Sequence, residues 1–258
     1  MKKCIWCSKS EDKVGFKKLA HTIPQSLGGK MVCKNVCDDC NLYFGSSQFQ
    51  TPSIETVIKE TFNISRARFL SSTGEMGKNK ALAKFSSIFF NVNFRSGTIT
   101  IKQKFKLQKH FQEKILLQLK RGLFKMFLEE IERQYCDGHN SKYDFIRAFS
   151  RYDFGEDLPL FYFERKYGLY LNMQDDIKHP VLLFDKDKRM KYLVNEPFFY
   201  EFELLGHVFA IPTSKNWQIG FDNFITKSLN AKKDYFTNYK MVTYFNEIDF
   251  TLKIMNDK

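Results

Sequence analysis

Two Cys-x-x-Cys pairs lie near the start of the chain, Cys4/Cys7 and Cys37/Cys40. Four thiolates satisfy the tetrahedral coordination of Zn²⁺, and the two-residue spacing lets each pair hold one edge of the ion. Four cysteines leave no coordination position for a substrate, so the pattern predicts a structural zinc. Its binding free energy would stabilise a segment too short to build a sufficient core. Cys33 and Cys136 have no partner pair, and we expect them to be unreactive thiols.

His21 stands between the two cysteine pairs. Imidazole titrates near neutral pH, so a histidine held at fixed geometry can take a proton from water. A histidine before Ile-Pro usually has no role, and only its place inside the zinc staple favours one here. The amide oxygen of Asn41 is a ligand of the kind that Mg²⁺ takes, since this ion keeps several waters and binds substrate phosphate. On residue type alone, Asn35 and Asn41 fit turn or helix-capping roles as well.

The charge of the chain predicts a polyanionic partner. It has 258 residues, 41 Lys and Arg against 29 Asp and Glu, a formal charge of +12 and an isoelectric point near 9.3. Lysines placed against phosphates release condensed counterions, which favours binding to nucleic acid over a solvated basic surface without a partner. Charge does not distinguish DNA from RNA. Four lysines near His21 are the candidates for phosphate contacts: Lys17, Lys18, Lys30 and Lys34.

The sequence contains no apolar stretch of the length needed for a secretory signal or a membrane span. We therefore expect a cytoplasmic protein with no membrane partner. In a reducing compartment, paired cysteines are more often metal ligands than disulfides. An apolar content of 43% is ordinary for a globular α+β protein.

The pattern of residues divides the chain near position 50. Residues 1–50 hold five of the six cysteines and predict a strand within 15–23 ending at His21, a turn, a second strand at 31–33 and a helix starting near Cys37. Residues 51–258 predict a larger mixed α+β accessory domain for substrate binding, sensing or dimerisation, and a homodimer is left open. No motif for reading bases is visible there.

Hydrophobic spacing gives the elements of the accessory domain. Helices are expected at 53–70, 111–133, 141–150 and 222–235, and a hairpin at 84–93 and 98–106. Strands are expected at 160–163, 168–171, 181–184, 192–194, 200–204, 208–211 and within 242–254. A basic cluster straddles the hairpin and the long helix: Lys102, Lys104, Lys106, Lys109, Lys114, Lys120 and Arg121. Some of these side chains could follow a nucleic-acid backbone, and most are expected on the solvated face of the two elements.

The run AHTIPQSLGGK at residues 20–30, followed by NVCDDCN at 35–41 and FG at 44–45, resembles the zinc-stapled branch of the HNH endonuclease family. The resemblance covers residues 4–45. It implies a ββα-metal, treble-clef-like module and metal-dependent hydrolysis of nucleic-acid phosphodiesters, with double-stranded DNA the expected substrate.

The same resemblance implies three roles. His21 matches the general base at the end of the first strand, and Asn35 matches the residue that braces it. Asn41 matches the helix position that ligates the catalytic Mg²⁺ or Mn²⁺, distinct from the structural Zn²⁺. Restriction, phage defence or mobile-element biology would fit such a nuclease by analogy.

Ala20 departs from the family pattern, which often has a ligating Asp, Glu or His before the base. Three outcomes follow from this departure. Asn41, phosphate and water hold the ion, or Asp38 or Asp39 also reaches it, or the activity is lost. Two alternatives to an active enzyme therefore stay open. One is a zinc-stapled nucleic-acid-binding module without catalysis. The other is a sensor or partner-binding protein whose output is the nuclease.

Overall fold

The fold begins with a small ββα unit. The computed structural model describes residues 1–47, 51–72, 87–93, 98–103, 110–152, 154, 157–166, 179–184 and 192–243. The first elements are β1 (Ala20–His21), η1 (Gln25–Leu27), β2 (Val32–Cys33) and α1 (Asp38–Gly45). Strands β1 and β2 pair antiparallel, with Ala20 opposite Cys33 and His21 opposite Val32. The predicted order of strand, loop, strand and helix is confirmed.

The first strand is shorter than its predicted range because residues 15–18 bond elsewhere. Asp38 donates its backbone N–H to the carbonyl of Gly15 at 2.8 Å, and its carboxylate accepts the N–H of Lys18 at 2.7 Å. This segment is therefore tied to the start of α1 instead of to a neighbouring strand.

Two long helices cross beside the ββα unit. They are α2 (Ile54–Ser72) and α5 (Phe111–Tyr135). At Gly122 they approach so closely that an added Cβ would lie 2.5 Å from Cγ1 of Ile58. The helix α5 ends at Tyr135 and is capped by Cys136, which has a left-handed backbone (φ 54°) and donates its N–H to the carbonyl of Glu132. Both predicted helices are confirmed.

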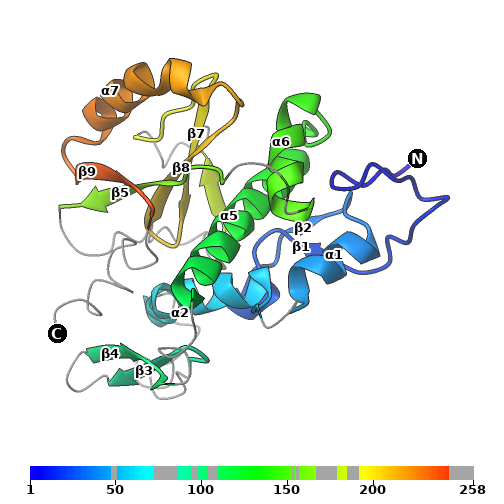
Figure 1. The fold of residues 1–258 in the computed structure, drawn as a ribbon, viewed down its shortest axis with the longest axis horizontal. Helices are drawn as coiled ribbons and strands as arrows, with labels where there is room; N and C mark the ends of the chain where they lie inside the picture. Colours follow the sequence, from blue (N-terminus) through cyan, green and yellow to red (C-terminus); the bar gives the residue numbers. More distant parts are fainter. Residues whose placement is uncertain are drawn as a thin grey trace.

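The expectation of a solvated face on α5 is confirmed for Lys114, which is exposed, and is wrong for two other basic residues of this helix. Lys120 and Arg121 are buried, as are Lys125, Glu129 and Glu130. In Figure 1 this helix passes through the middle of the molecule, with the ββα unit to one side and a β-sheet to the other. A helix covered on both sides buries its polar residues, and each of them then needs a partner.

In the part of the chain that the structure describes, the sheet has five antiparallel strands in the order β6-β7-β8-β5-β9. Their bounds are β5 (Phe161–Arg165), β6 (Leu182–Phe184), β7 (Phe199–Leu204), β8 (His207–Pro212) and β9 (Phe236–Met241). The helix α7 (Phe221–Lys232) follows η4 (Trp217–Gly220). Side chains of successive strand residues point to opposite faces. Phe199 stacks on Phe224 of α7, whereas Tyr200 and Phe202 meet Phe127 of α5. The sheet is thus covered on both faces.

Four of the predicted strands are confirmed as β5, β6, β7 and β8. Residues 192–194 do not form the predicted strand, because the N–H of Val194 donates to the side-chain carboxylate of Glu201 at 2.7 Å. The helix predicted to reach residue 235 ends at Lys232, and β9 follows it. The strand expected at 168–171, and residues 244–254 of the closing strand, lie outside the described residues.

The remaining elements are a hairpin and a helical turn segment. The hairpin consists of β3 (Phe90–Asn93) and β4 (Thr98–Ile101), paired antiparallel as predicted. The helix expected at 141–150 is confirmed as a run of mixed geometry: η2 (Ser141–Tyr143), α6 (Asp144–Arg147) and the π-helical η3 (Ala148–Tyr152).

Buried residues on both sides of position 50 belong to one hydrophobic cluster within the described part of the chain. It includes Trp6 and Phe44 of the ββα unit, Phe62 of α2, Leu123 of α5 and Phe202 of the sheet. The division into domains 1–50 and 51–258 stays a prediction. Among the described helices, none has the length and apolar character needed to cross a membrane.

Candidate functional site

The four paired cysteines converge on one point. Their sulfurs all lie within 4.8 Å of one another, and Sγ of Cys7 and Sγ of Cys37 are 3.7 Å apart. A tetrahedral Zn²⁺ with Zn–S bonds of about 2.3 Å separates its sulfurs by about 3.8 Å, so this donor set fits the ion. In the described part of the chain, this is the one group of three or more His, Cys, Asp and Glu side chains arranged to hold a metal.

The local backbone explains why the sulfurs meet. The first pair lies in a tight turn in which Ser8 donates to the carbonyl of Cys4 at 2.9 Å. Cys37 is the N-cap of α1, and its N–H donates to Sγ of Cys4 at 3.4 Å. Cys40 lies one helical turn later.

Mutual hydrogen bonding sets the protonation of the cluster. A hydrogen bond from Cys40, aided by backbone N–H groups, lowers the pKa of Cys4 to about 5. The same bond raises the pKa of Cys40, and burial raises that of Cys37 to about 11. The thiolate of Cys4 is thus formed readily, and a bound cation would favour the thiolate forms of Cys37 and Cys40. Burial also raises the pKa of Cys33, which lies outside the cluster.

His21 lies on the outward face of β1. Ala20 and Thr22 on either side of it are buried, whereas His21 and its partner Val32 are partly exposed. Alternation along the strand therefore directs the imidazole away from the core. The position where the family often has a ligand is occupied by the buried methyl group of Ala20, which is 1% exposed.

The helix α1 is tied to the same strand through Asn41. Its side-chain nitrogen Nδ2 donates to the carbonyl of Leu19 at 3.3 Å, two residues before His21. The oxygen Oδ1 is not used in that bond, and an amide oxygen is a suitable ligand for Mg²⁺ or Mn²⁺.

The side chain of Asn35 binds α5. Its Nδ2 atom donates to a carboxylate oxygen of Glu132 on that helix at 2.5 Å. The role of Asn35 as a brace for His21 stays a prediction. Its backbone carbonyl accepts the N–H of Ile5 at 2.8 Å, which joins the segment before α1 to the first cysteine turn. The described contacts of Asn35 are thus structural.

Asp38 and Asp39, the acids that could hold the ion in place of a ligand at position 20, differ in their surroundings. The carboxylate of Asp38 accepts the backbone N–H of Lys18, and this bond lowers its pKa. Asp39 is exposed on the first turn of α1. Asp38 is thus engaged by the loop before β1, which leaves Asp39 as the acid that faces solvent.

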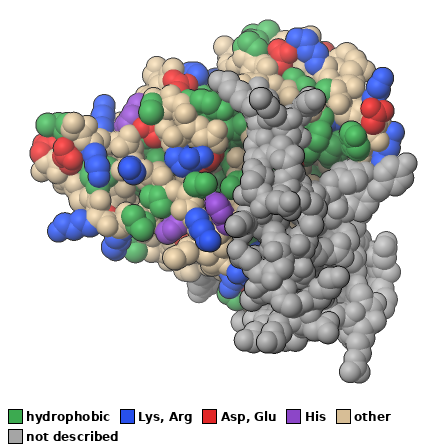
Figure 2. Space-filling view, turned by 180° about the vertical axis from the view of Figure 1, so that it is seen from behind, with side chains coloured by type: hydrophobic (Ala, Val, Ile, Leu, Met, Phe, Trp, Pro, Cys, Tyr) green, Lys and Arg blue, Asp and Glu red, His purple; other side chains and the backbone are tan. Residues whose placement is uncertain are grey.

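Basic side chains cover the ββα unit without forming a single stripe. Residues 1–50 contain eight lysines and four acids, and Figure 2 shows cationic side chains scattered over this part of the surface. All four lysines named as phosphate candidates are exposed: Lys17, Lys18, Lys30 and Lys34.

A second layer of contacts comes from α5 and was missed from the sequence. Lys125 donates to the backbone carbonyl of His21 at 3.0 Å and to Glu129 at 2.9 Å. Glu129 also accepts Nε1–H of Trp6 at 3.0 Å. The available signal was a Lys–Glu pair four residues apart inside the apolar stretch of 123–131.

The segment 144–152 holds the cysteine cluster from outside. Arg147 donates to the carbonyl of Ile5 at 2.5 Å, and Nε of Arg151 lies 3.5 Å from Sγ of Cys40. The Arg151 guanidinium also stacks over the ring of Tyr43, 3.9 Å from its centroid. Residues far downstream therefore position the N-terminal unit.

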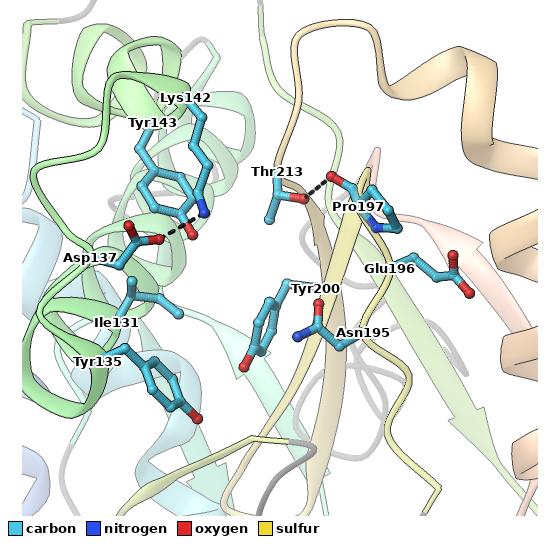
Figure 3. Close-up of a pocket in the computed structure, with 10 residues that line it drawn as sticks. All are labelled: Ile131, Tyr135, Asp137, Lys142, Tyr143, Asn195, Glu196, Pro197, Tyr200 and Thr213. Atoms are coloured by element: carbon cyan, nitrogen blue, oxygen red, sulfur yellow. Dashed lines mark hydrogen bonds and ion pairs between the residues drawn. The ribbon is translucent and has the colours of Figure 1, made fainter.

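A separate hollow of about 630 Å³ lies at the far end of α5. Figure 3 shows Tyr135 and Ile131 of α5 on one wall, Tyr143 and the Lys142–Asp137 ion pair beside them, and Tyr200 of β7 opposite. It contains none of the residues expected to act on a phosphodiester.

Comparison with known proteins matches residues 4–50 to the family described as HNH endonuclease. The chain therefore carries an HNH endonuclease domain at its N-terminus, with the cysteine cluster inside it and a mixed α+β fold around it. This domain indicates nuclease activity and a nucleic-acid substrate. No curated protein and no solved structure matches the chain.

Proposed function

We propose that the protein is a metal-dependent endonuclease that hydrolyses phosphodiester bonds of double-stranded DNA, with His21 as the general base. The observation that supports this most is the placement of His21 on the outward face of β1, next to the strand start that Asn41 binds. A nucleophilic water and a phosphate can reach that face, whereas the opposite face is in the core.

In this proposal, His21 accepts a proton from the water that attacks the phosphorus atom. The cysteine cluster would hold Zn²⁺ and supply no ligand position for substrate. Asn41 would hold Mg²⁺ or Mn²⁺ through Oδ1, and a bound divalent ion stabilises charge on the phosphate and leaving oxygens. The exposed lysines Lys17, Lys18, Lys30 and Lys34 contribute phosphate contacts.

The decisive experiment is cleavage of supercoiled plasmid DNA with Mg²⁺ or Mn²⁺ by the parent and by His21→Ala. His139→Ala is the matched control, because His139 is exposed and lies outside the HNH domain. We expect His21→Ala to lower the cleavage rate by about 100-fold or more, the range of general-base catalysis. Zinc content and DNA binding should not change.

Equal cleavage by parent and His21→Ala would overturn the assignment of the base. Binding without cleavage by the parent would favour the zinc-stapled binding module. A role in restriction or phage defence belongs to the same proposal, and plaque counts on cells expressing the parent or His21→Ala would test it.

The hollow at the end of α5 favours one second candidate, a nuclease controlled by a small ligand. Its walls come from the helix whose preceding turns contact Trp6 and His21. In that case, purified protein would cut slowly until a ligand is added, and Tyr135→Ala would abolish the response. Full activity of the purified protein without additions would exclude this candidate.

A further inference from the structure

The backbone carbonyl of His21 points away from its partner strand. Thr22 donates its N–H to the carbonyl of Met31 at 3.0 Å, in the register that places His21 opposite Val32. Hydrogen-bonded and non-hydrogen-bonded pairs alternate in an antiparallel ladder, so His21 and Val32 form a non-hydrogen-bonded pair. The His21 carbonyl therefore needs a partner from outside the sheet.

Lys125 of α5 supplies that partner. Its side chain is 2% exposed, and Nζ lies 3.0 Å from the His21 oxygen. Two carboxylates face the same ammonium: Glu129 at 2.9 Å and Glu55 of α2 at 3.9 Å. The ring of Phe44 lies 5.5 Å from Nζ. The charge of Lys125 is thus held in place by groups from three helices.

Glu129 extends this arrangement to the cysteine cluster. One carboxylate oxygen binds Lys125, and the other accepts Nε1–H of Trp6 at 3.0 Å. Trp6 lies between Cys4 and Cys7 in the first cysteine turn. A continuous chain of buried and partly buried hydrogen bonds therefore joins the turn that would hold zinc to the strand that carries His21.

We infer that Lys125, supported by Glu129, is a positioning residue for His21. The inference rests on the proposed function of His21 as the base. Strands β1 and β2 have two residues each, and so short a pair fixes its own orientation poorly. A displacement of about 1 Å in a reacting group can lower a rate by about 100-fold, so an external brace on this strand affects catalysis.

The test is a paired substitution that removes both charges, Lys125→Met with Glu129→Gln. Removing one partner alone would leave an unpaired buried charge and could unfold the protein, whereas removing both avoids this. The chain offers a matched control in Lys232→Met with Glu201→Gln, an equally buried pair between α7 and β7. Both double variants are made in the full chain.

We expect the Lys125/Glu129 double variant to lower kcat for plasmid cleavage by about 10- to 100-fold, with KM within about twofold of the parent. Zinc content should be unchanged, and the control pair should leave kcat unchanged. A parent-like kcat in the folded double variant, or an equal loss of kcat in the control pair, would overturn the inference.

A second readout does not need activity. The imidazole resonances of His21 are assigned in labelled protein by their loss in His21→Ala. In the Lys125/Glu129 double variant they should broaden or split, while those of His139 stay unchanged. If the parent proves inactive, the proposed function fails, yet altered His21 resonances would still show that Lys125 positions this strand. Unaltered resonances would overturn the inference by themselves.

Discussion

Two buried lysine–carboxylate pairs lie in different parts of the fold and differ in what surrounds them. Lys125 pairs with Glu129 where α5 meets the HNH domain, and Lys232 of α7 pairs with Glu201 of β7. Burial opposes the charge of both lysines. Glu129 and Glu55 together outweigh burial and raise the pKa of Lys125, whereas Glu201 does not outweigh it and the pKa of Lys232 is lowered.

The two lysines bind different parts of the fold, so the two pairs should have different roles. Lys125 keeps its charge and directs it at the backbone of His21, in another element of the fold. Lys232 lies over the ring of Phe163 of β5 and donates to the carbonyl of Tyr192, so it attaches α7 to the sheet and to the segment before β7. We therefore expect the first pair to affect catalysis and stability, and the second to affect stability alone.

Metal removal should produce the largest difference in stability between the HNH domain and the sheet. Structural zinc contributes about 10–16 kcal/mol of apparent binding free energy in small domains. Chelation should therefore increase amide hydrogen exchange throughout residues 4–44, while β7 and β8 stay protected. Hydrogen exchange with mass spectrometry measures both regions in one sample. Simultaneous loss of protection in both would contradict the comparison.

Breaking the pair in the sheet region should have the next largest effect. Lys232→Met leaves Glu201 buried without its cation and should lower the free energy of unfolding by about 3–5 kcal/mol. Cleavage per folded molecule should be unchanged. Urea denaturation and plasmid assays measure the two quantities, with the exposed Lys227→Met as the control. A loss of kcat in folded Lys232→Met would show that both pairs reach the active site.

The free energy of unfolding should change with pH because the pKa of Glu129 is raised in the folded protein. Burial raises its pKa to about 7 against the attraction of Lys125, so the folded state holds this proton more tightly than the unfolded state. The resulting stabilisation is complete below about pH 4.5 and is lost as the pH rises through about 7, in total about 3 kcal/mol.

Glu129→Gln should remove this slope. The free energy of unfolding of the parent minus that of the variant should fall between pH 5 and pH 8, as measured by urea denaturation with zinc present. Glu11→Gln, at an exposed site of the HNH domain, is the control. A difference that stays constant with pH would mean that Glu129 titrates as an ordinary carboxyl group.

The two tryptophans allow a smaller test. Trp6→Phe keeps the ring contact with Phe44 but removes the hydrogen bond to Glu129, which should cost about 1.5–3 kcal/mol for a bond to a charged group. Trp217→Phe, beside α7, changes only ring packing and should cost less. Denaturation curves of the two variants measure the difference. Equal losses would mean that the Trp6 bond adds no stability.

The smallest effect should come from Glu55→Gln. This side chain is 30% exposed and lies 3.9 Å from Lys125, so its screened contribution is below about 1 kcal/mol. The substitution should nevertheless make the Lys125 site resemble the Lys232 site and lower the pKa of Lys125. NMR titration of the Lys125 side chain would detect this shift, and an unchanged titration would remove Glu55 from the explanation.

The sequence predicted the cysteine cluster because its ligands recur at fixed short spacing. It also predicted α5 from the periodicity of Ile115, Leu119 and Leu123, which one buried face is enough to produce. It did not predict that α5 is covered on both sides, since Lys125 and Glu129 read as solvent-exposed charges until their partners are known. The turn of Asn35 towards Glu132 was hidden for the same reason, because the two residues are 97 positions apart.

The side chains that hold the HNH domain in place come from residues far downstream in the sequence, and this limits where the chain can be truncated. Residues 1–47 are contacted by α5, by Arg147 and by Arg151. These residues lie more than sixty positions after residue 50, where the family match ends. A fragment that ends at that boundary would expose Trp6 and Phe44 and lose the contact between Lys125 and the backbone of His21. A fusion protein that contains the HNH domain should therefore also include α5.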